Sequence, residues 1–225
     1  MSNLDLGWCQ SYEAIKYHMI EAYKEKNLDY SNVRPDAPIV IFSQSYYNDI
    51  CSLNHEKIYD YCFIGSIRSA PEKRKWVIDF AKTHFTEKSI FVNTDHDPNW
   101  TLLGVFDKSH ENLGYCPKNE PNNQTRFVQF REVNENIFYF QTMCQSKFIL
   151  NPAGDAPWSF RFYETLLCKS LPIVENWHHT YRTAEESKIP YKYLLFNDIH
   201  NFNQEKYQEL IDENTKIFET YHMLN

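Results

Sequence analysis

Arg161 and Glu164 are the residues of this chain whose types and spacing most directly suggest ligand chemistry. They stand three positions apart in an aromatic-rich segment that predicts a helix over about 157–169, so their side chains share one helix face. That segment is apolar nearly all round, as in a helix buried on a sheet, and a charge in such a setting needs a partner. One alternative is an internal Arg161–Glu164 pair. The other gives Arg161 to phosphate oxygens and Glu164 to ribose hydroxyls, and spacing alone does not decide between them.

The sequence on either side of this helix predicts a β-α-β unit. A short apolar strand at 147–151 leads into a loop of Pro, Gly and Asp, and a second apolar strand at 171–174 follows the helix. Parallel strands joined by a crossover place this loop, with Gly154, at the carboxyl edge of the sheet. There the free N–H groups of the helix N-terminus can face an anion such as a diphosphate.

The string SKFILNPAGDAPWSFRFYETLLCKSLPIVE, from Ser146 to Glu175, resembles the donor-nucleotide segment of exostosin-like glycosyltransferases. The resemblance is close over these residues and looser from Tyr61 to about Leu195, where it includes Gly65 and Arg68 in a loop after a strand. In that family a Ser-x-Arg-x-x-Glu pattern contacts the nucleotide sugar. The resemblance therefore implies a donor site that includes Ser159, Arg161 and Glu164. One departure is Lys169, because a Gly commonly stands there in the family.

The resemblance also implies a fold and an activity. We expect an α/β protein whose Rossmann-like parallel sheet is flanked by helices, as in the donor domain of GT-B enzymes, with an abbreviated N-terminal part. The expected activity is transfer of a hexosyl or pentosyl group from a nucleotide sugar, UDP-linked by family analogy, to a hydroxyl group of a glycan or other acceptor, with inversion. No cofactor is expected, because the nucleotide sugar is a substrate.

Inversion requires a base that deprotonates the acceptor hydroxyl. Asp155 in the donor loop is one candidate, and its alternative role is the N-cap of the following helix. Asp95 is the second candidate, within an Asp-His-Asp triplet that also contains His96 and Asp97. The triplet has three interpretations: a solvated turn, an acceptor or base site, or a metal site resembling the DxD motif. Since GT-B enzymes generally work without such a metal, we expect none.

Acceptor or sugar contacts are expected at two further places. His178 and Arg182 follow the strand at 171–174, at the sheet edge where ligand contacts gather in open α/β folds. The adjacent His178 and His179 have no third ligand at metal-site spacing, so one of them lining the donor site is the expected role. Residues 94–123 are polar and turn-rich, and a loop of that length is usually functional.

The composition limits the partners. With 23 Lys and Arg against 30 Asp and Glu, the net charge is −7, which argues against nucleic acid as the principal partner. The basic run at 68–75 is either a solvated loop and helix start or a rim that attracts an anionic donor. Glu185 and Glu186 are expected as a charged pair on a helix surface. Six cysteines include no CxxC pair, so free thiols are expected. The chain has no apolar run that could span a bilayer and no secretory leader, which predicts a cytoplasmic protein.

We expect two parts, a reduced N-terminal segment at 1–54 and a nucleotide-sugar-binding domain at 55–225. A GT-B enzyme usually has two such domains, so the acceptor half is expected to be abbreviated or supplied by a partner chain or a second copy. Two alternatives stay open: a non-catalytic nucleotide-sugar-binding subunit, and a GT-B transferase of another family that uses a GDP-sugar. Further elements are expected as helices at 11–26, 72–83, 127–144 and 204–222, and as strands at 39–42, 61–64, 89–92 and 191–196.

Overall fold

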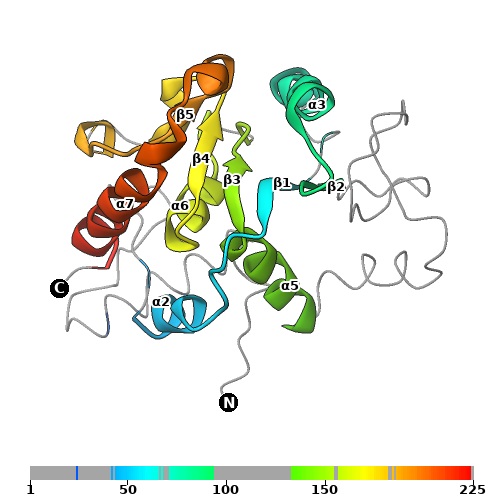
Figure 1. The fold of residues 1–225 in the computed structure, drawn as a ribbon. Coiled ribbons are helices and arrows are strands. Elements are labelled where there is room, and N and C mark those ends of the chain that lie inside the picture. The colour runs from blue at the N-terminus through cyan, green and yellow to red at the C-terminus, as the bar shows by residue number, and fades with distance from the viewer. Residues whose placement is uncertain are drawn as a thin grey trace.

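A computed structural model describes residues 24, 42, 44–65, 67, 71–93, 133–154, 157–181, 184 and 186–223. Within them, five parallel strands form one sheet in the order β2-β1-β3-β4-β5 (Figure 1). The strands are β1 (Tyr59–Gly65), β2 (Ile90–Asn93), β3 (Ser146–Leu150), β4 (Leu171–Val174) and β5 (Leu194–Leu195). The prediction of an α/β fold with a parallel sheet is confirmed.

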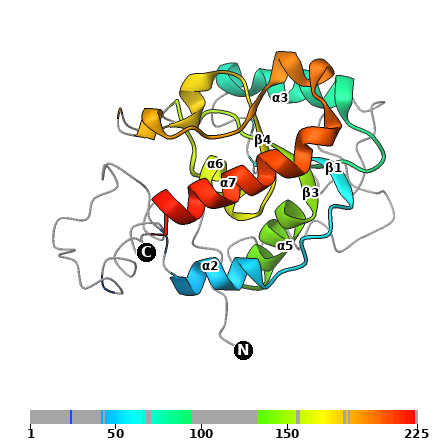
Figure 2. The ribbon, with the colours of Figure 1, turned by 60° about the vertical axis from the view of Figure 1, so that its left-hand side comes forward.

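Helices cover both faces of this sheet. The α-helices are α2 (Gln44–Cys51), α3 (Pro71–His84), α5 (Val133–Cys144), α6 (Phe160–Leu167) and α7 (Tyr207–Tyr221). Short 3-10 helices are η2 (Trp177–Thr180), η3 (Glu186–Lys188), η4 (Phe196–Asn201) and η5 (Gln204–Lys206). Figure 2 shows α3 on one side of the strands and α2 and α5 on the other.

Two apolar cores follow from the alternation of side chains along each strand. In β1, Cys62 and Ile64 pack into a core with α2, α5 and α6, which we call the α5/α6 core. Phe63 points the other way into a core with α3, which we call the α3 core. Residues of β4 alternate in the same way, and all four are buried. Strands covered on both faces explain the nearly continuous apolar runs in the sequence.

The strand order defines a switch point between β1 and β3. The chain passes from β1 to β2 on one side of this point and from β3 through β4 to β5 on the other. The helix α3 that follows β1 lies over the α3 core, whereas α6, which follows β3, lies over the α5/α6 core. In open sheets of this kind, ligands bind beyond the carboxyl ends of the strands at the switch point. Here those ends are Gly65 and Leu150.

Lys169 lies in the turn that ends α6. The Lys169 N–H donates to the Leu166 carbonyl at 3.0 Å and the Ser170 N–H donates to the Thr165 carbonyl at 3.1 Å, which is the Schellman arrangement. Lys169 has a φ of 52°, in the left-handed region that favours glycine. Lys169 therefore ends α6 in a conformation that glycine adopts without strain.

Several predicted boundaries differ from the structure. Helix α6 begins at Phe160 rather than near 157, and its N-cap is Ser159, so the alternative role of Asp155 as N-cap is wrong. The strand predicted at 191–196 is reduced to β5. The reason is that Asn214 of α7 bonds both backbone groups of Lys192, at 2.8 Å each, in place of a neighbouring strand.

Two elements predicted near the chain ends also differ from the structure. Phe42 is the one described residue of the strand predicted at 39–42; it lies outside the sheet and donates its N–H to the His222 carbonyl at 2.9 Å. The final helix starts with the 3-10 turn η5 rather than as an α-helix at 204. Of the helix predicted at 11–26, Lys24 is described and is helical, and the rest lies outside the described residues.

One charge prediction was wrong. The sequence suggested a surface pair at 185–186, but Glu186 is fully buried and accepts a hydrogen bond of 2.7 Å from the Tyr163 hydroxyl.

The described helices include none with the length and apolar character needed to cross a bilayer.

Candidate anion-binding site at the β1/β3 switch point

Arg161 reaches across the switch point. It stands in the first turn of α6, and its Nη2 donates a 2.6 Å hydrogen bond to the carbonyl of Ile64, at the end of β1. The guanidinium carbon lies 5.3 Å from the centre of the Phe63 ring. Its Nε has no hydrogen-bond partner among the described residues. An arginine has five N–H donors, so most of this side chain's capacity for binding an oxyanion is unused by the described residues.

Gly65 makes this approach possible. A Cβ atom at position 65 would clash with Nη2 of Arg161 and crowd the Phe63 ring. Gly65 therefore lies beside Arg161, and its lack of a side chain allows the arginine to lie against the backbone at the end of β1. Its assignment to a donor site stays a prediction.

Two more cationic side chains come from the first turns of α3. Lys73 donates from Nζ to the carbonyl of Gly154 at 3.3 Å, and Arg74 donates from Nε to the carbonyl of Ala153 at 3.1 Å. They join the basic run of the sequence to the loop after β3, which supports its interpretation as a rim of the site. Three cations from two helices thus lie around the carboxyl ends of β1 and β3, an arrangement that favours a diphosphate electrostatically.

Glu164 lies in the buried layer between α5 and α6. Its side chain is 2% exposed, and its Oε2 accepts a 2.6 Å hydrogen bond from the Tyr139 hydroxyl. Burial raises the pKa of Glu164 to about 7, against the opposing effects of the Tyr139 hydrogen bond and the Arg161 charge. Its Oε1 has no partner among the described residues.

The internal pair considered for Arg161 and Glu164 is not formed. The described residues include no ion pair between the two, and Arg161 instead bonds the backbone of β1. Ser159 is the N-cap of α6, and its side chain makes no capping bond to the helix. The roles predicted for Ser159 and Glu164 toward a nucleotide stay predictions.

The segment after β4 adds a histidine that the sequence could not single out. His179 in η2 is half-buried, and its Nδ1 has no partner among the described residues. Burial lowers the pKa of His179, and the nearby His178 and Lys73 lower it further. His178 is exposed, and its Nδ1 lies 3.3 Å from the Tyr181 hydroxyl. Only the adjacency of two histidines after a strand hinted at this, and it cannot tell which of them turns inward.

Asn151 is a second residue that sequence analysis missed. It follows β3 directly, is buried, and its side chain donates to the Ile149 carbonyl at 2.7 Å while accepting from the Thr165 hydroxyl at 3.2 Å. It therefore fixes the start of the loop after β3 against α6. An Asn that directly follows an apolar strand and precedes Pro was the available signal.

The remaining predicted site residues lie outside the described residues, and their assignments stay predictions. They are Arg68, Asp95, His96, Asp97, Asp155 and Arg182. In the part of the chain that the structure describes, no three His, Cys, Asp or Glu side chains are arranged to hold a metal ion.

No protein-family model matches the chain, and no curated protein matches it either. The fold class, an open parallel α/β sheet with a cationic switch point, is defined by the structure.

Proposed function

We propose that this chain is a glycosyltransferase that binds the diphosphate of a nucleotide sugar at the β1/β3 switch point. The observation that carries the proposal is the position of Arg161. It reaches from α6 to the end of β1 with its Nε unpaired among the described residues, at the edge of the sheet where such folds bind ligands. Lys73 and Arg74 add positive charge beside the loop that resembles the exostosin donor segment.

This arrangement suits the departure of a nucleoside diphosphate. As the acceptor oxygen bonds to the anomeric carbon, the bond from that carbon to the diphosphate oxygen breaks and negative charge grows on the leaving group. Fixed cations in a partly buried site stabilise that charge better in the transition state than in the bound donor. Glu164 is proposed to accept from the ribose hydroxyls, and Asp155 or Asp95 to take the acceptor proton.

Within the same proposal, residues 55–225 are the donor domain of a GT-B enzyme that uses UDP. The acceptor half is abbreviated or comes from a partner chain or a second copy. The most direct test is calorimetric titration of UDP and inorganic pyrophosphate into the purified chain and into Arg161→Gln. Since hydrogen bonds to charged groups contribute about 1.5–3 kcal/mol, the substitution should weaken both ligands by about 10- to 150-fold.

Lys147→Met provides the matched control. Lys147 stands near the amino end of β3 and pairs with Asp60 at 2.9 Å. Its replacement by methionine removes one positive charge from the same sheet, at the edge opposite the proposed site. Its UDP affinity should stay within about twofold of the parent. Circular dichroism and thermal unfolding of all variants separate loss of the site from loss of the fold. Equal UDP affinity in Arg161→Gln and the parent would refute the site.

Turnover then separates the rival functions. The purified chain, mixed with UDP- and GDP-sugars and hydroxyl acceptors, should release nucleoside diphosphate from a UDP-sugar. Binding without release under all conditions would indicate a nucleotide-sugar-binding subunit. Release from GDP-sugars in preference to UDP-sugars would indicate a transferase of another GT-B family.

A further inference from the structure

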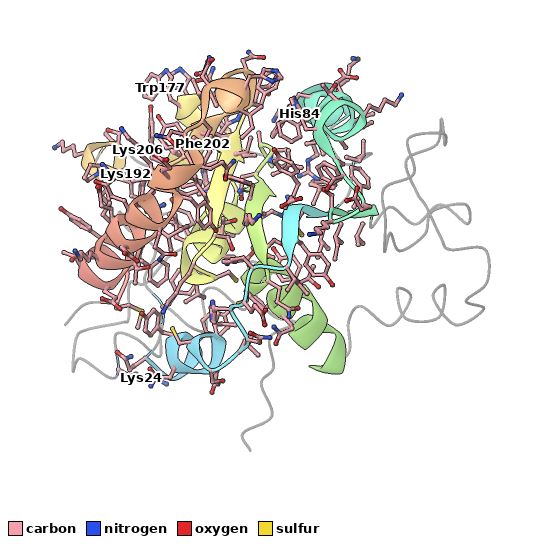
Figure 3. All side chains as sticks on the ribbon, in the orientation of Figure 1. Lys24, His84, Trp177, Lys192, Phe202 and Lys206 are labelled. Atoms are coloured by element: carbon pink, nitrogen blue, oxygen red, sulfur yellow. The ribbon has the colours of Figure 1, made fainter. Side chains whose placement is uncertain are left out.

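The carboxyl ends of α5 and α6 meet in a group of thiols and cations at the amino edge of the sheet. Cys144 is the last residue of α5 and Cys168 is the C-cap of α6, just before β3 and β4 begin. Both side chains are fully buried free thiols. His55 and Lys57, from the irregular segment between α2 and β1, complete the group, which we call the thiol cluster. Figure 3 labels Trp177 just after β4, and the thiol cluster lies at the other end of that strand.

Lys57 holds the backbone of the two cysteines together. Its Nζ donates to the Cys144 carbonyl at 2.6 Å, to the Cys168 carbonyl at 3.2 Å and to the Ser170 hydroxyl at 2.8 Å. Among the described residues, no carboxylate forms an ion pair with this ammonium group. Burial lowers the pKa of Lys57 to about 8, and the negative charge that the two thiols can carry opposes this effect. Within the described part of the chain, sulfur rather than a carboxylate therefore balances the lysine charge.

His55 supplies the second cation. Its Nδ1 lies 3.3 Å from the Cys168 carbonyl, and its Nε2 lies 3.1 Å from the Ile50 carbonyl. A carbonyl oxygen only accepts hydrogen bonds, so both ring nitrogens must carry a hydrogen for both bonds to form, which is the imidazolium state. A hydrogen bond with the Cys144 side chain is the largest cause that raises the pKa of His55, and it favours the same state.

The two thiols of the cluster differ in their tendency to ionise. A hydrogen bond with Cys168 lowers the pKa of the Cys144 thiol, against the effect of burial, and the hydrogen bond and charge of His55 and the charge of Lys57 lower it further. Burial raises the pKa of Cys168, and its hydrogen bond with Cys144 raises it further. The two sulfurs are thus in contact, with Cys144 as the thiolate and Cys168 as the protonated thiol. This is the division of roles between a nucleophilic and a resolving cysteine.

One layer of chain separates Cys144 from solvent. His55 and Lys57 are only half-buried, and the residues on either side of each are exposed. The segment 52–58 that carries them belongs to no helix or strand. Such segments open locally at a lower free energy than the core beneath them. A small neutral oxidant can therefore reach the Cys144 sulfur without global unfolding.

We propose that Cys144 and Cys168 are a modification site, a dithiol that hydrogen peroxide oxidises to a disulfide. The Cys144 thiolate attacks one peroxide oxygen, the O–O bond breaks, and the departing hydroxide takes a proton from His55 and leaves as water. The Cys168 sulfur then attacks the sulfur of the Cys144 sulfenic acid. The S–O bond breaks, and the hydroxyl leaves with the thiol proton as a second water. Two sulfurs are thereby oxidised by two electrons in total, and one peroxide is reduced to two waters.

This inference is independent of the proposed function. The thiol cluster lies before the first residues of β1, β3 and β4, whereas the proposed donor site lies beyond the carboxyl ends of β1 and β3. Oxidation of the dithiol can therefore be measured without a nucleotide, and failure of UDP to bind would not affect it.

Peptide mapping after treatment with hydrogen peroxide tests the proposal directly. The reduced, folded chain is exposed to increasing peroxide, and the remaining thiols are then alkylated in urea before digestion with trypsin. Cys144 and Cys168 fall in different peptides, 132–147 and 162–169, and each of these contains no other cysteine. We expect the two peptides to be joined, and to separate again after treatment with dithiothreitol.

Cys62 is the control thiol within the same molecule. It is as fully buried as Cys144 and lies in the same α5/α6 core, but burial raises its pKa to about 12. It should stay reduced at peroxide concentrations that oxidise Cys144. Because both thiols are followed in the parent chain, this comparison does not depend on the folding of any variant.

Two substitutions separate the roles within the cluster. Cys168→Ser lacks the resolving thiol, so Cys144 should accumulate as the sulfenic acid, which dimedone traps. His55→Gln removes the imidazolium and should slow the oxidation of Cys144 by about 3- to 10-fold. His200→Gln is its matched control, because His200 is an exposed histidine in η4; it should leave the rate unchanged. Circular dichroism before peroxide is added checks that each variant is folded.

Three results would overturn the inference. The first is a Cys144 thiol that peroxide leaves reduced in the folded parent chain. The second is oxidation of Cys62 as fast as that of Cys144, which would show that the thiols react only after the core has opened. The third is a disulfide from Cys144 to any cysteine other than Cys168. An equal rate in His55→Gln and the parent would overturn the role given to His55.

Discussion

The Tyr139 hydroxyl donates a 2.6 Å hydrogen bond to Oε2 of Glu164, which joins α5 to α6 inside the apolar core between them. This contact lies at a carboxyl group that is 2% exposed. Burial consequently raises the pKa of Glu164 to about 7, despite the Tyr139 hydrogen bond and the nearby Arg161 charge. A group proposed to bind ribose is therefore also a source of pH-dependent stability.

Glu164→Gln should remove that pH dependence. Between about pH 4.5 and 7 the folded chain holds a proton on Glu164 that the unfolded chain has lost, so the free energy of unfolding of the parent falls as pH rises through this window. Glutamine does not titrate. Urea unfolding should therefore show that the free energy of unfolding of Glu164→Gln, relative to that of the parent, is higher at pH 8 than at pH 5 by about 1 kcal/mol or more. One pKa unit corresponds to about 1.4 kcal/mol.

Glu219→Gln is the control for this experiment. The Tyr47 hydroxyl donates to Oε1 of Glu219 at 2.6 Å, so it is also a Tyr–Glu pair, but an exposed one. Measured at both pH values, it shows how far replacing a hydrogen-bonded carboxylate by an amide changes stability in an exposed pair. A Glu164→Gln difference that is the same at pH 5 and pH 8 would mean that the Glu164 pKa is not raised by folding.

Glu164→Gln should also weaken the binding of ribonucleotides as a class. If the Glu164 carboxylate accepts from the ribose hydroxyls, Gln loses a charged hydrogen bond worth about 1–3 kcal/mol, whatever sugar the donor carries. Calorimetry should show a loss of about 5- to 150-fold for UDP and UDP-sugars alike, with pyrophosphate unaffected. A loss confined to one sugar donor would instead assign Glu164 to recognition of the sugar.

Lys169→Gly should stabilise the protein. Lys169 holds a φ of 52° in the Schellman turn that ends α6, a conformation that costs a residue with a Cβ about 1–2 kcal/mol and costs glycine nothing. Glycine also has more entropy to lose on folding, so the net gain should be about 0.5–1 kcal/mol. Thermal unfolding should show a rise in Tm of about 1–4 °C. Lys169→Ala removes the same side-chain charge but keeps the strain, and a gain equal to that of Gly would attribute the effect to charge.

Lys57→Met should destabilise the protein. The Lys57 ammonium group bonds the carbonyl oxygens of Cys144 at 2.6 Å and Cys168 at 3.2 Å, and the Ser170 hydroxyl at 2.8 Å. It therefore caps the carboxyl ends of both α5 and α6. Methionine fills the space but donates nothing, so urea unfolding should show a loss of about 1–3 kcal/mol. Lys147→Met, which breaks a partly exposed pair, should lose at most about 1 kcal/mol, and a similar loss in both variants would argue against the double cap.

Local patterns predicted the elements of this fold well, because each depends on neighbours in sequence. The unit β3-α6-β4 was expected from its apolar strands and its aromatic helix, and its second strand was placed at the observed residues. The two-residue length of β5 could not be foreseen, because it depends on Asn214, a side chain of a later helix. Periodicity also says nothing about the order of strands, so the switch point between β1 and β3 required the structure.

In the candidate site, too, the sequence carried the local signals but not the contacts between distant segments. The sequence singled out Arg161 as a charge on an apolar helix, but its hydrogen bond joins it to Ile64, 97 positions earlier. Glu186 was assigned to the surface because two acidic residues normally lie in water, and the Tyr163 hydroxyl that pairs with it in the core has no local sequence signal. Contacts between distant segments decided both outcomes.

Binding and turnover of the nucleotide sugar should not require a divalent metal ion. Arg161, Lys73 and Arg74 already lie around the proposed diphosphate site, so a divalent ion is redundant for neutralising the leaving group. UDP binding and turnover of a UDP-sugar should therefore persist in excess EDTA. Assays with and without EDTA, and then with Mn²⁺ restored, measure this directly. Loss of turnover on chelation, recovery with Mn²⁺, and a matching loss in Asp95→Ala and Asp97→Ala would instead make the Asp95–Asp97 triplet the metal site, because carboxylates at that spacing can share one ion with the diphosphate.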